Sequence, residues 1–215
     1  MSQLKVTYVD HMGNDLRIVN SARISFGGES ESITDKDKKL IKYLADNKHM
    51  SPFEHNVLTV IIECPLYIRS QIHRHRTLCF NEISRRYTSE NIQFFTPDTI
   101  RKQAKSNRQA SDGELEPDKA LQALQLIEQQ HKDAEIAFNK LLDLGVPREQ
   151  ARGVLPQNLM TKFYATGNLR NWVHFVNLRI DKHAQQEVRC IGEQLLAILN
   201  EKFPEATKAL MSDND

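Results

Sequence analysis

The nine residues NVLTVIIEC, positions 56–64, constrain the fold most. They are apolar and rich in β-branched side chains over a length typical of a strand, which predicts a buried β-strand. Pro65 follows directly, and proline suits the first turn of a helix, so a helix is expected through LYIRSQIHR, residues 66–74. Alternating apolar residues in LKVTYVD, residues 4–10, predict a second strand near the start of the chain.

Helical periodicity is clearest after Pro117, and Gly145 followed by Pro147 predicts where that helix stops. The residues that recur at helical spacing are Leu121, Leu124, Ile127, His131, Ala134, Phe138 and Leu141.

Other segments complete the expected order of elements. Thr34 or Asp35 is placed to cap a helix through KKLIKYLADN, residues 38–47. A strand is expected over 159–168 and helices over 147–156, 169–179 and 184–203. Strands come early and helices dominate late, which predicts an α+β fold: a mixed or antiparallel sheet with flanking helices and a helix-rich C-terminal half.

The length of 215 residues predicts a single domain, 1–215, and the polar segment 101–116 is expected to be an exposed loop. The chain carries 29 Lys and Arg against 28 Asp and Glu, a net charge of +1, which argues against a surface that binds DNA or acidic membranes as a whole. Three cysteines without a CxxC pair, and no apolar run long enough to span a bilayer, predict a cytoplasmic protein with no membrane partner.

Positive charge is concentrated locally, in RHRTLCFNEISRRY, residues 74–87, where Glu82 is the only acid. Every cation here except the histidine is an arginine, whose planar fork binds phosphate in a bidentate way. Together with Asn81 and Ser84, these residues favour a nucleotide or dinucleotide as the ligand. A solvated surface face is the simplest alternative, and a nucleic-acid-binding module that stacks bases on Tyr87, Phe94 and Phe95 is another.

Two other kinds of site remain open from the residues alone. Cys64, His73, His75 and Cys79 lie within sixteen residues, which allows a zinc site, although the flanking arginines disfavour a dication and no metal is expected. Cys79 also lies in a cationic neighbourhood of the kind that activates a nucleophilic thiolate.

The motif resembles a known family. Arg74-His75-Arg76, seven residues and then Ser84 match the RHR-x7-S signature of the flavin-dependent thymidylate synthases. Asn81, Glu82, Arg86 and Tyr87 fit the fuller pattern, while Cys79 departs from it, since the family usually has Ser there. Further blocks resemble the family in the right order: HMGND, SARISF and SPFEH upstream, then GVPREQAR, LPQNL, NLRNWVHFVNLR and HAQQEVR downstream.

The resemblance implies reductive methylation of dUMP to dTMP, with methylenetetrahydrofolate as carbon donor, NADPH as reductant and bound FAD as cofactor. It also implies that no enzyme cysteine attacks uracil, and that a homotetramer builds active sites from several subunits. The chain has no GxGxxG, so its FAD site is not expected to be a Rossmann crevice.

The resemblance also implies roles for individual residues. Arg179 is expected to polarise or ionise N3 of dUMP, although local sequence alone allows a salt bridge to Asp181 or Glu187. Ser51 is alternatively a helix cap, and His174 an ordinary half-buried histidine. The expected cofactor contacts are Ser51, Arg74, His75, Arg76, Glu82, Asn168, Arg170 and His174. The expected substrate contacts are Gln71, Arg74, Glu82, Ser84, Arg85, Arg86, Arg152 and Arg179.

Overall fold

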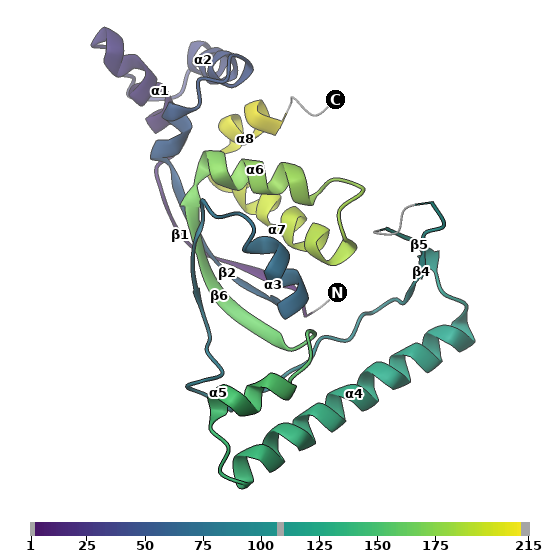
Figure 1. The fold of residues 1–215 in the computed structure, drawn as a ribbon. Coiled ribbons are helices and arrows are strands. Elements are labelled where there is room, and N and C mark those ends of the chain that lie inside the picture. Colours follow the sequence, from purple (N-terminus) through teal and green to yellow (C-terminus); the bar gives the residue numbers. More distant parts are fainter. Residues whose placement is uncertain (1–2, 107–109, 212–215) are drawn as a thin grey trace.

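A four-stranded antiparallel sheet forms the centre of the protein (Figure 1). The computed structural model describes residues 3–106 and 110–211. The strands lie in the order β1-β2-β6-β3, and helices pack against the sheet, which confirms the predicted α+β fold with an antiparallel sheet. Their bounds are Lys5–Met12 for β1, Val57–Pro65 for β2, Cys79–Glu82 for β3 and Met160–Asn168 for β6.

The central pair, β2 and β6, is registered over nine residues, from Val57 opposite Asn168 to Pro65 opposite Met160. Side chains alternate between the two faces of a strand, so every second residue of β2 enters the core. Leu58, Val60 and Ile62 are fully buried as a result. The apolar run that predicted a buried strand is therefore the central strand of the sheet.

Helices cover one face of this sheet (Figure 1). α6 follows β6 directly, and its Trp172 is fully buried and donates its indole N–H to the Leu58 carbonyl of β2 at 3.0 Å. α7 packs along α6, where a Cβ on Gly192 would meet Ile180 at 2.9 Å, so glycine allows the close approach. The bounds are Leu66–Ile72 for α3, Leu169–Arg179 for α6, Gln186–Lys202 for α7 and Pro204–Met211 for α8.

The segment between β1 and β2 adds two helices and two 3-10 turns. Thr34 caps α2 through a capping box with Asp37, which confirms one of the two predicted caps. Asp37 also pairs with Arg23 at 2.5 Å, which ties α2 to the end of α1. The bounds are Asp15–Arg23 for α1, Ile24–Phe26 for η1, Asp35–Asp46 for α2 and Ser51–His55 for η2.

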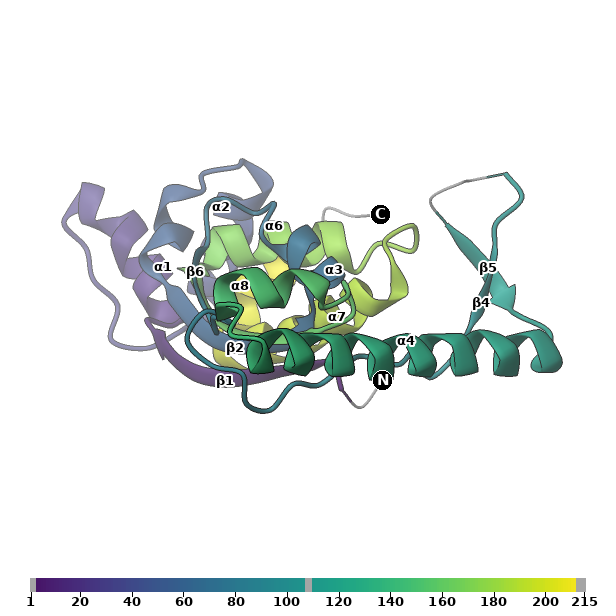
Figure 2. The same ribbon diagram turned by 60° about the horizontal axis from the view of Figure 1, so that its bottom comes forward.

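The predicted long helix is α4, Pro117–Asp143. Both views show that its N-terminal half extends beyond the sheet and the helices that cover it (Figure 2). Only the middle and end of its predicted apolar face are buried, at His131, Ala134 and Phe138, while Leu121 is 58% exposed. His131 is held there by stacking on Phe94. After α4 come α5, Arg148–Ala151, and η3, Arg152–Val154.

The prediction of a loop over 101–116 is wrong in one respect. Arg101–Gln103 and Ser111–Glu114 pair as strands β4 and β5 of an antiparallel hairpin, while residues 107–109 of the predicted loop lie outside the described residues. The hairpin is exposed, as expected. It is fixed to α7 by the Arg101 guanidinium, which contacts both carboxylate oxygens of Glu187 at 2.8 and 2.9 Å.

No helix within residues 3–106 and 110–211 combines the length and apolarity needed to cross a membrane.

Asp15 joins the two ends of the chain. Its carboxylate accepts the backbone N–H groups of Glu205 and Ala206 at 2.9 and 3.0 Å, and so satisfies two free donors in the first turn of α8. The side chain is buried, and desolvation raises its pKa despite these bonds.

We expect Asp15→Ala to lower the free energy of unfolding by about 1–3 kcal/mol, because two buried amides lose their acceptor. Asp15→Asn keeps an acceptor oxygen without a buried charge, and should remain within about 1 kcal/mol of the natural protein. Urea unfolding of the three proteins at neutral pH measures this. Equal stability of the Ala and Asn variants would contradict the capping role.

Candidate active site

The last turns of α3 and α6 meet at Arg179. Its Nε donates to His75 Nε2 at 3.1 Å, and its Nη2 donates to the Gln71 carbonyl at 3.2 Å. The alternative of a salt bridge to a nearby acid is wrong, because Asp181 binds His183 and Glu187 binds Arg101. Arg179 is thus held by two neutral acceptors, and burial lowers its pKa.

His75 is neutral at ordinary pH. It is 8% exposed and packs against the rings of His174 and Phe175. Desolvation, followed by the charge of Arg179 and the neighbouring His174, lowers its pKa to about 4. Since arginine only donates, the Nε2 atom that faces Arg179 carries no proton, and the proton of the neutral ring lies on Nδ1.

Arg74 and Arg76 lie on either side of His75, in the turn between α3 and β3, and both are exposed. The turn is closed by backbone bonds from His75 to Ile72 and from Leu78 to His75. Of the three residues of the RHR motif, His75 is therefore buried in the protein, while Arg74 and Arg76 are exposed to solvent. The helix expected over 66–74 ends at Ile72, two residues earlier than predicted.

Three of the expected cofactor residues line one cavity of about 790 Å³, called here the α6 cavity. They are Asn168, Arg170 and His174, and they share it with apolar side chains such as Met50 and Val173. Arg170 pairs with Glu54 of η2, while the Asn168 side-chain oxygen caps α6 at the Asn171 N–H. Ser51 begins η2 and is exposed, and it makes no side-chain cap there.

A second cavity, of about 630 Å³, holds several expected substrate residues and is called here the β3 cavity. Glu82, Ser84, Arg85 and Arg152 line it. Arg86 is not among its lining residues; it is exposed and pairs with Glu149 at 3.4 Å.

Sequence reasoning missed the two residues that orient Glu82. Thr161 donates its hydroxyl to the Glu82 carboxylate at 2.6 Å, and Arg69 lies 3.5 Å from the same oxygen. The only sequence signal was the strand over 159–168, because the pairing of Glu82 with Phe163 brings Thr161 beside it.

The Arg85 side chain stabilises the loop that follows β3. Its guanidinium is buried and donates to the carbonyls of Glu90 and Asn91 at 2.5 and 3.1 Å, which shapes the following loop. Burial lowers its pKa. The neighbouring Arg86 is therefore the more available of the two for a ligand.

The described chain does not gather all expected substrate residues in one place. Gln71 turns away from the β3 cavity: its amide binds Gln185, whereas Arg69, two helical positions or about 200° away, lines the cavity. Glu82 pairs with Phe163 of β6, five residues or about 17 Å along the strand from Asn168 and the α6 cavity. Glu82 therefore lies apart from the other expected cofactor residues.

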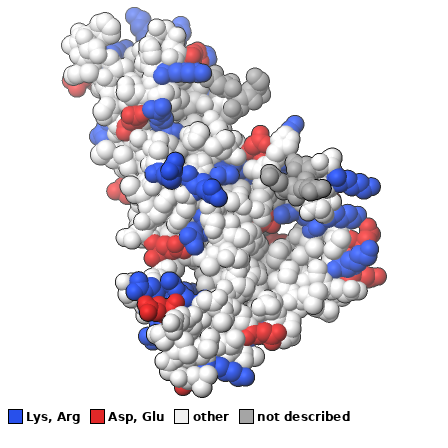
Figure 3. All heavy atoms as spheres, viewed as in Figure 1, with Lys and Arg blue, Asp and Glu red and all other residues white. Residues whose placement is uncertain are grey.

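The part of the chain that the structure describes holds no group of three or more His, Cys, Asp and Glu side chains placed to bind a metal ion. Of the possible zinc ligands, Cys64 is buried in the core and Cys79 is exposed on β3. Basic side chains on the face in Figure 3 form small groups with acids between them, rather than one continuous basic surface.

Comparison with known proteins supports the resemblance. The family described as Thymidylate synthase complementing protein matches residues 7–205. A flavin-dependent thymidylate synthase of Thermus thermophilus is 42% identical over 204 residues, which are 95% of this chain and 74% of that protein. One from Thermosipho melanesiensis is 40% identical over 206 residues, 96% of this chain and 90% of that protein.

A solved structure is also similar over nearly its whole length. The crystal structure of the UMP/dUMP methylase PolB from Streptomyces cacaoi, bound with 5-Br dUMP, matches with a TM-score of 0.88 at 32% sequence identity, and covers 97% of this chain and 95% of that one. These matches favour the enzyme over the nucleic-acid-binding module. The chain belongs to the flavin-dependent thymidylate synthase family.

Proposed function

We propose that this protein methylates dUMP to dTMP, with methylenetetrahydrofolate as carbon donor, NADPH as reductant and bound FAD as cofactor. The observation that carries the proposal is the guanidinium of Arg179, fixed by His75 and the Gln71 carbonyl and paired with no acid among the described residues. An oriented guanidinium whose charge no acid cancels can stabilise the uracil base of dUMP as that base becomes negative during the reaction. The family membership and the dUMP analogue bound to PolB support the same substrate.

The α6 cavity has the chemistry that FAD requires. Met50, Val173 and Leu210 offer apolar surface, and the amides of Asn168, Asn171 and Asn177 offer hydrogen bonds. Lys48 offers positive charge, while Arg170 is paired with Glu54, which also lines the cavity. The exposed Arg74 and Arg76 are available to a bound pyrophosphate or ring edge. When bound, the flavin supplies the hydride and carries the one-carbon unit.

The chain's own residues then bind and polarise dUMP. Ser84, Arg86 and Arg152 suit the phosphate of dUMP. Arg86 is available to it because its salt bridge to Glu149 is exposed and therefore weak. Glu82, oriented by Thr161, accepts hydrogen bonds from the nucleoside. Arg179 lies at the O2–N3–O4 edge of uracil and stabilises negative charge there, so no cysteine nucleophile is required.

The division of substrate residues between two places supports the proposal of a homotetramer with shared active sites. Gln71 and Arg179 lie at the junction of α3 and α6, while Glu82, Ser84 and Arg152 line the β3 cavity. A closed symmetric assembly would bring the junction of one copy to the β3 cavity of another. We also propose that residues 1–215 act as one domain in the cytoplasm, in keeping with three free cysteines.

The first test measures the reaction in the natural protein and in Cys79→Ser. We expect flavin absorbance in both, and dUMP-dependent oxidation of NADPH that yields dTMP when methylenetetrahydrofolate is present. Because Cys79 is exposed on β3 and the proposal gives it no role, the variant should keep most of the turnover. A colourless protein that does not take up FAD would refute the proposal. Near-complete loss of turnover in Cys79→Ser would instead support a nucleophilic Cys79 thiolate.

A second test addresses Arg179. We expect Arg179→Ala to keep its flavin but to lose at least about 100-fold in kcat, because it removes charge stabilisation at uracil. Arg179→Lys keeps the charge without the two directed hydrogen bonds, so its kcat should lie between that of Arg179→Ala and that of the natural protein. Flavin absorbance and kcat are measured on the same samples. Turnover within about twofold of the natural protein in Arg179→Ala would contradict the assignment.

Complementation tests the shared site. Arg152→Ala and Arg179→Ala should each be nearly inactive alone. In co-expressed mixed oligomers, about one quarter of the sites would combine an intact Arg152 from one copy with an intact Arg179 from another, and activity should recover to that extent. Arg179→Ala co-expressed with Arg179→Lys is the matched control and gains nothing beyond its parts. Mixed oligomers that mass spectrometry confirms and that stay inactive would rule out sharing.

A further inference from the structure

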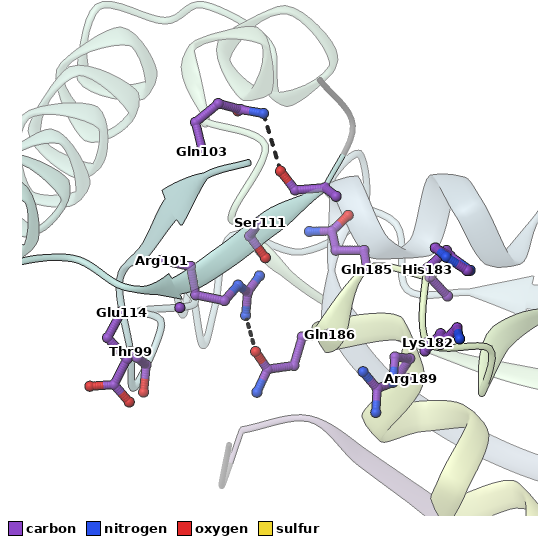
Figure 4. Close-up of a pocket in the computed structure, with 13 residues that line it drawn as sticks. Thr99, Arg101, Gln103, Ser111, Glu114, Lys182, His183, Gln185, Gln186 and Arg189 are labelled. Atoms are coloured by element: carbon purple, nitrogen blue, oxygen red, sulfur yellow. Dashed lines mark hydrogen bonds between the residues drawn. The ribbon is translucent and has the colours of Figure 1, made fainter. Parts of the chain in front are cut away.

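A third cavity, of about 560 Å³, lies between the β4–β5 hairpin and the segment that joins α6 to α7 (Figure 4). We call it the hairpin cavity. Arg101, Gln103, Ser111 and Glu114 reach it from the hairpin. Lys182, His183, Gln185, Gln186 and Arg189 line the opposite side. None of the residues that form the expected flavin or dUMP contacts is among its lining.

Positive charge is available in this cavity. Arg101 is neutralised by Glu187, and His183 is paired with Asp181. Lys182 donates no hydrogen bond to any described residue, and Arg189 has only a distant partner, Glu193, at 3.9 Å. An anion that enters from solvent would therefore meet two cations without a close ion pair, Arg189 and Lys182, the latter beside Asp181, together with the Glu114 carboxylate.

Two buried donors also lack partners. The Nε atoms of Arg101 and Arg189 are both buried and make no hydrogen bond within the described residues. Such groups are uncommon in folded proteins and call for an acceptor. Both belong to side chains that line the hairpin cavity.

The lining shows which part of a ligand would fit. Its one aromatic ring is the His183 imidazole and alanine is its largest apolar residue, so it offers less apolar surface for the large flat rings of a flavin or a pteridine than the α6 cavity does. It offers instead cations for phosphate groups, with Ser111, Gln103 and the Glu114 carboxylate for ribose hydroxyls.

A run of direct contacts joins the hairpin cavity to the α6 cavity. Gln185 lines the first cavity and binds Gln71, whose carbonyl holds Arg179. Arg179 binds His75, and the His75 ring lies against that of His174, which lines the α6 cavity. These contacts link the two cavities through the junction of α3 and α6.

We propose that the hairpin cavity binds the ribose and phosphate groups at the adenosine end of NADPH and leaves the nicotinamide free to reach the flavin. This proposal rests on the proposed function, and adds the place where the reductant is recognised. Lys182 and Arg189 contact the phosphate groups, and the hairpin provides the ribose contacts.

The test follows flavin reduction by NADPH in anaerobic stopped-flow experiments on the holoenzyme. Lys182→Ala and Arg189→Ala should each raise the apparent Kd for NADPH by about tenfold, the effect of losing one charge-assisted contact. The limiting rate of reduction and the flavin content should stay unchanged. Lys182→Arg should keep most of the affinity, and Lys140→Ala, an exposed lysine on α4, is the matched control.

A second measurement separates this proposal from the proposed function. Dithionite reduces the flavin without NADPH, and the reduced enzymes then form dTMP from dUMP and methylenetetrahydrofolate in a single turnover. The alanine variants should match the natural protein in this assay. A slower single turnover in the alanine variants would indicate that the cavity binds folate. An unchanged Kd for NADPH would show that the cavity does not bind NADPH. Either result would overturn the proposal. Absence of dTMP in the natural protein would instead refute the proposed function.

Discussion

The nine-residue ladder between β2 and β6 is the constraint on which the rest of the structure depends. Its strands are antiparallel, so α3 leaves one end of the pair and α6 leaves the other. The ladder is about 30 Å long, and the two helices measure about 10 Å and about 16 Å. The C-terminal ends of the two helices meet where Arg179 binds the Gln71 carbonyl. The register of the sheet thus positions the candidate catalytic arginine.

Sequence patterns predicted the elements that carry their own signal. β2 was predicted from its apolar run, and α4 from apolar residues that recur at helical spacing over several turns. α2 was predicted because Thr34 is a recognisable helix cap. β3 was missed, since CFNE is a strand only because β6 offers a free edge beside it. The hairpin was missed for a similar reason, because its anchor is a contact between Arg101 and Glu187, 86 residues apart in the chain. On α4, the period identified the helix but not which part of its apolar face has a partner, as the exposure of Leu121 shows.

The residue types of the candidate site were predictable, whereas their grouping was not. The Arg-rich segment looked like one surface for one anion, but its members separate: His75 turns inward, Arg85 holds backbone carbonyls, and Arg86 pairs across to Glu149. Which cavity each residue joins depends on the pairing of β3 with β6 and on helical phase. The strand pairing is not encoded locally. Thr161 and Arg69 could not be recognised as partners of Glu82 before that pairing was known.

The acids nearest Arg179 explain why its charge remains uncancelled. Asp181 and Glu187 are the acids that follow Arg179 most closely in the sequence. Asp181 instead accepts from the backbone and ring of His183, and Glu187 is occupied by Arg101 of the hairpin. Neutral acceptors are left to orient Arg179, and the low pKa of His75, about 4, keeps it one of them. Among the described residues, Arg179 therefore binds two neutral acceptors and no acid, while the two acids that follow it in the sequence are bound by His183 and by Arg101 of the hairpin.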